Sequence, residues 1–270
     1  MEAKRAGLGD GSGSVALSCR TVDFGYILIS MKAFILAAGN GTRLRPLTAT
    51  TPKCLLPIQG VPLLEIWLNN CMRAGITDVL VNAHAHTAAI RDFAVKQRTG
   101  VAVTVAEEPQ LLGSAGTLAA NRGFVAGEKA FFVLYGDVLT NIDFERMLHF
   151  HQQKHLAATL GIYQVPDPTR CGIVSVDEKA VIQSFVEKPA RPDSNWAFSG
   201  VMIAGQEIFD LLPEERPADI GFHVLPKMVG RMSAYAVSEY LLDIGTLANY
   251  EAAQQSWPGL TRAQHSGRNI

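Results

Sequence analysis

The stretch from residue 32 to 58 carries the residue types and spacing that best fit a chemical task. A short apolar run at 33–37, typical of a buried parallel strand, leads into it. Two glycines and three cations follow: Gly39, Gly41, Arg43, Arg45 and Lys53. Glycine adopts positive φ at no steric cost, so consecutive backbone N–H groups can converge on an anion, and the cations favour the same ligand. The pattern predicts a phosphate-binding loop.

Two better-known glycine loops do not fit this stretch. Leu44 stands where a dinucleotide-binding fingerprint has its third glycine, and Pro46 prevents a helix from continuing through the turn. No Gly-Lys-Ser or Gly-Lys-Thr follows at the spacing of a P-loop. An NAD-binding oxidoreductase is therefore disfavoured.

The full pattern is Gly-x-Gly-Thr-Arg-Leu-x-Pro-Leu-Thr, with Pro-Lys at 52–53 and Leu-Leu-Pro at 55–57. It resembles the signature of the sugar-phosphate nucleotidylyltransferases, also called NDP-sugar pyrophosphorylases, and the resemblance extends from residue 31 to about residue 255. It implies that Arg43 and Lys53 are catalytic. It also implies a set of nucleotide-binding residues: Leu36, Ala38, Gly39, Gly41 and Thr42.

Composition sets the class of protein. A chain of 270 residues with 48% hydrophobic content can bury a full core, and its net charge of −1 gives no argument for nucleic acid or a membrane surface as a partner. The cysteines form no CxxC pair and suggest free thiols in a reducing cytosol, hence a cytoplasmic protein: Cys19, Cys54, Cys71 and Cys171. The sequence is also compatible with a homo-oligomer.

Strand and helix patterns alternate in the first half, which predicts an α/β fold with a mainly parallel sheet flanked by helices and ligands at the carboxyl ends of strands. The expected elements are helices at 62–74, 87–95 and 143–155, and strands at 76–81, 101–105 and 131–134. The resemblance implies the Rossmann-like, mixed sheet of the nucleotide-diphospho-sugar transferase type.

The second half is richer in strand patterns, which suggest a small mixed sheet lying over the first half. The expected strands are 157–163, 173–176, 181–186, 196–203 and 232–237, with short helices at 206–212 and 220–230 and a closing helix at 246–254. The predicted organisation is an extension of flexible composition at 1–30, one domain at 31–256 and a tail at 257–270.

Two aspartates end apolar runs far apart in the sequence. Asp137 follows the strand expected at 131–134, and Asp243 follows two leucines and precedes Ile244-Gly245-Thr246. Each aspartate alone is more often a cap or turn residue. Because they resemble the Gly-Asp and Asp-x-Gly-Thr segments of the family, both are predicted to bind Mg²⁺, which prefers one or two carboxylates plus substrate phosphate oxygens.

The segment 107–118 places Gly113 and Gly116 among small residues before an expected helix. From the residues alone, a plain loop-to-helix junction fits as well as a ligand site. The segment is similar to the Leu-Gly-Thr-Ala-Gly segment of mannose-1-phosphate guanylyltransferases. That resemblance implies that both glycines lie near a guanine base, so GTP is the favoured nucleotide.

The sugar side of the site is implied by resemblance alone. Glu187-Lys188-Pro189 matches the family's Glu-Lys-Pro, in which the glutamate binds sugar hydroxyls and the lysine binds phosphate. Gly172 matches the glycine of Tyr-Gly-Val, but Cys171 replaces the tyrosine. Phe198-Ser199-Gly200 stands where many members have Asn-x-Gly, and it resembles N-acetylmuramate-1-phosphate uridylyltransferases.

The resemblance therefore implies transfer of a nucleoside monophosphate from an NTP, favoured as GTP, to a sugar 1-phosphate, favoured as mannose 1-phosphate. UTP or dTTP with N-acetylmuramate 1-phosphate or glucose 1-phosphate is an alternative. A non-catalytic protein that senses NDP-sugar is another.

Overall fold

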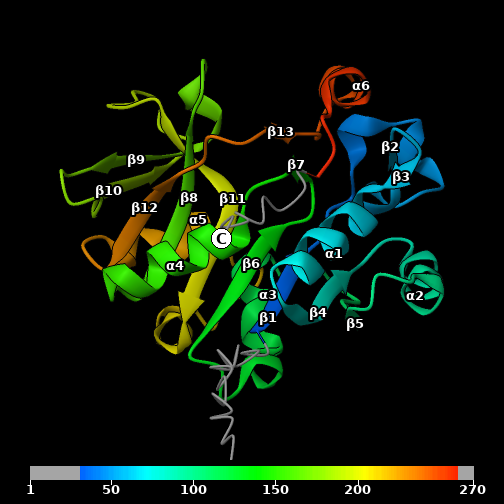
Figure 1. Ribbon diagram of the computed structural model, residues 1–270, viewed down its shortest axis with the longest axis horizontal. Coiled ribbons are helices and arrows are strands. Elements are labelled where there is room, and N and C mark those ends of the chain that lie inside the picture. Colours follow the sequence, from blue (N-terminus) through cyan, green and yellow to red (C-terminus); the bar gives the residue numbers. More distant parts are fainter. Residues whose placement is uncertain (1–30, 261–270) are drawn as a thin grey trace, which may run out of the picture.

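The computed structural model describes residues 31–260, which build one large sheet with helices on both faces (Figure 1). Its parallel half contains β1 (Met31–Leu36), β4 (Ile76–Ala83), β5 (Ala102–Glu107) and β6 (Ala130–Tyr135). Strand β1 pairs in parallel with β4 and β6, and β4 pairs with β5. The predicted α/β fold with a mainly parallel centre is confirmed.

The strands of the second half belong to the same sheet, not to a separate one lying over the first half. They are β8 (Ala158–Gln164), β9 (Gly172–Val176), β10 (Ile182–Glu187), β11 (Trp196–Gly205) and β12 (Met232–Ala236). Strand β11 joins the halves because it pairs antiparallel with β6, β8 and β9. A sequence pattern identifies a strand but not its partner, so the shared sheet was not foreseen.

Six α-helices lie within residues 31–260: α1 (Leu63–Arg73), α2 (Thr87–Lys96), α3 (Ser114–Ala120), α4 (Phe144–Lys154), α5 (Ile220–His223) and α6 (Leu247–Ser256). Helix α1 ends as expected, because Gly75 adopts a φ of 74° just beyond it. The helix expected at 206–212 is instead a 3-10 helix at Gln206–Leu211. The one expected at 220–230 splits into α5 and the 3-10 helix Leu225–Met228, whose first turn contains a proline.

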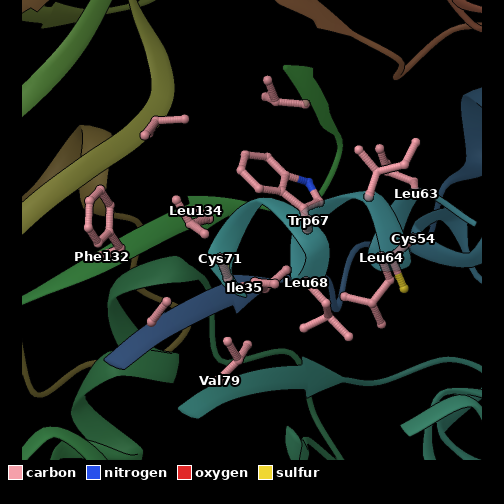
Figure 2. Packing of buried hydrophobic residues seen from close by; sticks show 14 of the residues in the cluster. Ile35, Cys54, Leu63, Leu64, Trp67, Leu68, Cys71, Val79, Phe132 and Leu134 are labelled. Carbon is pink, nitrogen blue, oxygen red and sulfur yellow. The ribbon is translucent and has the colours of Figure 1, made fainter. Parts of the chain in front are cut away.

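Neighbouring residues of β1 point into opposite cores. Ile35 packs with α1 and α4, and Phe34 packs with α3 and α5. Figure 2 shows Trp67 and Leu68 of α1 over the first of these faces, close to Ile35 and Leu134. Both faces of the central strands are therefore buried, which explains why their sequences are continuous apolar runs.

Two short antiparallel strand pairs lie outside the main sheet. Strand β2 (Pro57–Ile58) pairs with β3 (Val61–Pro62), and β7 (Val138–Thr140) pairs antiparallel with β13 (Leu241–Asp243). Figure 1 shows the chain running from the side of β12 to the side of α6, with β13 on the way. Within residues 31–260, no helix combines the length and the apolar character needed to cross a bilayer.

The packed region continues past residue 256, where the domain was expected to end. The ring of Trp257 packs against Tyr240 with centroids 5.3 Å apart, and Asn141 donates a hydrogen bond to the carbonyl of Gly259 at 3.1 Å. We therefore propose that the domain extends at least to residue 260. The extension predicted at 1–30 lies outside the described residues.

Candidate active site

The glycine loop forms one wall of a cavity of about 540 Å³ at the carboxyl ends of β1 and β6. All five predicted nucleotide-binding residues of this loop line it: Leu36, Ala38, Gly39, Gly41 and Thr42. Gly41 has a φ of 60°, and an added Cβ would lie 2.9 Å from Cγ2 of Thr48. Thr48 also donates a hydrogen bond to the Gly41 carbonyl at 2.8 Å. Position 41 therefore needs glycine for conformation and for space.

Two predicted cations meet at one point of this cavity. Arg43 and Lys53 both line it, as does Gly245 from the far end of the chain. A Cβ added at Gly245 would lie 3.0 Å from Nη2 of Arg43 and 3.3 Å from Nζ of Lys53. Lys53 also pairs with Asp137, with Nζ 2.7 Å from Oδ2. Glycine at 245 thus leaves room for two cations beside a carboxylate.

The two predicted metal ligands are neighbours across the β7–β13 pair. Asp243 lies opposite Val138, the residue after Asp137, and the N–H of Ile244 donates to the Asp137 carbonyl at 3.0 Å. Desolvation, and then the Asp137 carboxylate, raise the pKa of Asp243, whereas Lys53, the Gly245 N–H and Arg43 lower it. Mutual repulsion of two carboxylates is the electrostatic setting that a cation relieves.

This donor set fits a magnesium ion shared with substrate. Within the described residues, no three His, Cys, Asp or Glu side chains gather into a group that could hold a metal by themselves. Mg²⁺ keeps few protein ligands and takes the rest from phosphate and water, so two adjacent carboxylates beside a predicted phosphate-binding loop would suit it.

A buried polar network that the sequence analysis did not identify also lines the cavity, next to the start of the glycine loop. Asn82 and Glu108, at the carboxyl ends of β4 and β5, both line the cavity. Asn82 accepts a hydrogen bond from the Ala37 N–H at 2.6 Å and donates to Oε1 of Glu108 at 2.9 Å. Thr117 also donates to Oε1 of Glu108, and the Leu112 N–H donates to Oε2. The available signal was the position of both residues at strand ends.

The loop before α3 is tied to the segment 216–219. Gly113 lines the cavity, whereas the α-carbon of Gly116 faces Arg216, whose Cδ would lie 2.7 Å from an added Cβ. The N–H groups of Ala115 and Gly116 both donate to the carbonyl of Ala218. The N–H groups of the first turn of α3 are therefore already hydrogen-bonded within the protein. Of the two glycines predicted to lie near the base, Gly113 lines the cavity and Gly116 does not.

Replacing Gly113 with Ala should destabilise the fold by about 2 to 4 kcal/mol. Its φ of 75° and ψ of 164° are almost exclusive to glycine, and an added Cβ would overlap the Ala218 carbonyl. Thermal and urea unfolding measure the change. Gly123→Ala is the control, because nothing lies within 4 Å of a Cβ there. Equal unfolding midpoints for both variants would contradict the prediction.

The predicted sugar-side residues separate into two groups, and neither lines the cavity. Glu187 and Lys188 follow one another at the end of β10, and a Cβ at Gly172 would lie 2.7 Å from Oε2 of Glu187. Ser199 is only 2% exposed and accepts a hydrogen bond from the Val201 N–H, so its hydroxyl is held inside the sheet. Gly200 packs against Tyr135 with a φ of 79°.

The sugar-side carboxylate is nevertheless electrostatically linked to the cavity. Desolvation raises the pKa of the Glu187 carboxyl. The nearby Lys188 ammonium lowers that pKa, and the Asp219 carboxylate raises it. Burial raises the pKa of Tyr135, a cavity residue, and Asp219, Glu187 and Asp137 add to that rise. Carboxylates of both the sugar side and the predicted metal side therefore influence the Tyr135 hydroxyl.

Comparisons with known proteins decide the family. A model of the family described as nucleotidyl transferase matches residues 32–258. The chain belongs to the nucleotidyl transferase family. Mannose-1-phosphate guanyltransferase beta-A of Xenopus laevis is 34% identical over 222 residues, covering 80% of this chain and 61% of that protein. The beta-B protein of the same organism is 32% identical over 245 residues, covering 88% and 68%. The predicted resemblance to this family is confirmed.

A solved structure supports the fold. UDP-glucose pyrophosphorylase complexed with UDP-glucose superposes with a TM-score of 0.74 at 23% identity, covering 84% of this chain and 98% of that one. The nucleotidyl transferase domain described above is thus shared at the level of the whole sheet. Because this chain spans 61% of the beta-A protein, the activity of the relatives bears on it only as a proposal.

Proposed function

We propose that this nucleotidyl transferase moves a nucleoside monophosphate from GTP to mannose 1-phosphate or a related sugar 1-phosphate and releases pyrophosphate. The observation that carries the proposal is the convergence of Arg43, Lys53 and Asp243 on Gly245, with Asp137 paired to Lys53. Cations beside paired carboxylates suit a site that must bring two phosphates together. The similarity to two mannose-1-phosphate guanyltransferases supports the choice of substrates.

The reaction we propose is an in-line displacement. An oxygen of the sugar 1-phosphate forms a bond to the α-phosphorus, the bond to the β-phosphate breaks, and pyrophosphate leaves with the electron pair. Arg43 binds the departing pyrophosphate, while Lys53 and Lys188 bind the attacking phosphate. Their task is to align two anions and offset their repulsion, so no protein group needs to transfer a proton. A Mg²⁺ ion held by Asp137 and Asp243 would supply Lewis-acid neutralisation of the phosphate oxygens.

Glu108 supports guanine as the base. Its Oε2 accepts a hydrogen bond from the Leu112 N–H at 3.1 Å, and a carboxylate oxygen can accept a second. The donors of Asn82 and Thr117 hold Oε1, which fixes the carboxylate as an acceptor toward the cavity. Guanine presents an exocyclic amino donor that uracil and thymine lack.

A panel of nucleotides and sugar phosphates, scored by pyrophosphate release under Mg²⁺, tests the proposal. We expect the highest kcat/KM with GTP and mannose 1-phosphate. A preference for UTP or dTTP would replace the substrate choice and keep the reaction class. Tight binding of an NDP-sugar without turnover would instead favour the non-catalytic sensor. The aspartate pair argues against that alternative, because sensing alone does not require a metal site.

Glu108→Gln should lower kcat/KM for GTP about 10-fold and bring UTP closer to GTP. The amide replaces one acceptor by a donor that faces the donors of guanine. Glu107→Gln is the matched control, because Glu107 is exposed and pairs with Arg91. An unchanged ratio of GTP to UTP activity in Glu108→Gln would show that Glu108 does not read the base.

We also propose a cytoplasmic location. Among the described residues the cysteines are free: Cys54, Cys71 and Cys171. Burial raises the pKa of Cys54 to about 12, which keeps that thiol protonated and unreactive near the cavity. Free thiols suit a reducing compartment.

A further inference from the structure

Phe222 exposes its ring beside the sugar-side residues of the site. It is 52% exposed, although phenylalanine is usually buried. The preceding residue, Gly221, has its α-carbon against the Glu187 carboxylate, where a Cβ would overlap Oε2. Helix α5 therefore approaches the end of β10 at backbone distance, and Phe222 is carried to the Glu187–Lys188 turn.

The backbone that carries the Phe222 ring is tied to a residue of the cavity through Asp219. Oδ1 of Asp219 accepts hydrogen bonds from the N–H groups of Gly221 and Phe222, at 2.8 and 3.2 Å. Oδ2 of Asp219 accepts from the hydroxyl of Ser114, a cavity residue, at 3.0 Å. The backbone of Phe222 is thus anchored although its ring faces outward.

Lys188 is held in an unusual conformation next to this ring. Its φ of 50° is rare for a residue with a side chain, and its N–H donates to the Cys171 carbonyl at 2.9 Å. Its Nζ lies 3.7 Å from Oε1 of Glu187 and 5.5 Å from the centroid of the Phe222 ring. The ammonium therefore has a carboxylate and an aromatic face as neighbours.

We propose that Phe222 is a positioning residue that holds the Lys188 ammonium for the phosphate of the sugar substrate, an inference that rests on the proposed function. A free lysine side chain loses much rotamer freedom when it binds an anion, and a cation–π contact removes part of that freedom beforehand. Glu187 would compete with phosphate for the same N–H donors. The ring does not, because it attracts the charge through its face and accepts no strong hydrogen bond.

The test compares Phe222→Leu, which keeps an apolar side chain, with Phe222→Trp, which keeps the aromatic face. We expect Phe222→Leu to raise KM for the sugar 1-phosphate about threefold, with kcat and KM for the nucleotide nearly unchanged, and Phe222→Trp to stay at the parent value. In a Lys188→Met background, Phe222→Leu should have no further effect. Equal KM values for the parent and Phe222→Leu would overturn the proposal, as would the same threefold loss in the Lys188→Met background.

A second readout needs no substrate. After reductive ¹³C-methylation of lysines, the Lys188 signal, assigned from Lys188→Arg, should move when Phe222→Leu removes the ring current and should remain in place in Val186→Ala. Val186 is 50% exposed and precedes Glu187, on the opposite face of the strand. A Lys188 signal that does not move in Phe222→Leu would overturn the contact. If the parent turns over no sugar 1-phosphate while the signal moves, the proposed function fails and the contact stands.

Discussion

Asp137→Asn is expected to lower turnover by about 10³-fold, the largest loss we predict for a single substitution. The amide removes one of the two negative charges of the proposed Mg²⁺ site, and it also removes the ion-pair partner of Lys53, whose Nζ lies 2.7 Å from Oδ2. Turnover is measured as pyrophosphate release over a range of Mg²⁺ concentrations. The half-saturating Mg²⁺ concentration should rise together with the loss of rate.

Asp243→Asn separates the loss of a metal ligand from the loss of the Lys53 ion pair. Among the described residues, Lys53 forms its ion pair with Asp137 and not with Asp243. A comparable loss of rate and a comparable shift in Mg²⁺ dependence are expected. Asp92→Asn is the charge control, since Asp92 pairs only with Lys96 on the exposed face of α2 within the described part of the chain. Near-parental rates and Mg²⁺ dependence in both site variants would remove the aspartate pair from the mechanism.

Arg43→Ala is expected to lower kcat about 10²-fold. The guanidinium loses its charge-assisted bonds to the departing pyrophosphate, which grow stronger as negative charge develops on it. In the reverse direction, KM for pyrophosphate should rise while KM for the NDP-sugar changes little. Stopped-assay kinetics in both directions measure this split.

Arg43→Lys should recover part of the loss, because an ammonium restores the charge but not the planar, bidentate donor geometry. Arg91→Ala is the matched control, since Arg91 forms an exposed ion pair with Glu107 away from the cavity. If Arg43→Ala raised KM for the sugar 1-phosphate instead of KM for pyrophosphate, Arg43 would bind the sugar 1-phosphate and not the pyrophosphate.

Local sequence patterns predicted the parts of the site that lie within one loop. The apolar run of β1 and the glycines after it required only local backbone chemistry, and Gly39 and Gly41 do line the cavity. The positions of Asp137 and Asp243 were likewise visible, because an aspartate next to a glycine after an apolar run is a local signal. A different local signal, apolar residues at helical spacing followed by a glycine, identified helix α1 and its end at Gly75.

Contacts between distant segments could not be read in this way. Gly116 and Ser199 match positions of the family's motifs. In the structure, however, Gly116 packs against Arg216 and the Ser199 hydroxyl is held inside the sheet. Glu108 was overlooked because its significance comes from Asn82 and Thr117, which reach it from other elements. No property of a residue's own neighbours in sequence records such partners.

The sequence by itself determined that a glycine-rich loop with three cations follows a buried strand, that the fold is α/β, and that Asp137 and Asp243 each follow an apolar run. Those features follow from side-chain periodicity, glycine conformation and charge, all of which act over a few residues. The tertiary structure decided that β13 pairs with β7 and so places Asp243 beside Asp137, and that β11 joins both halves in one sheet. Backbone pairing between distant strands depends on the packing of the whole chain, which only the folded structure specifies.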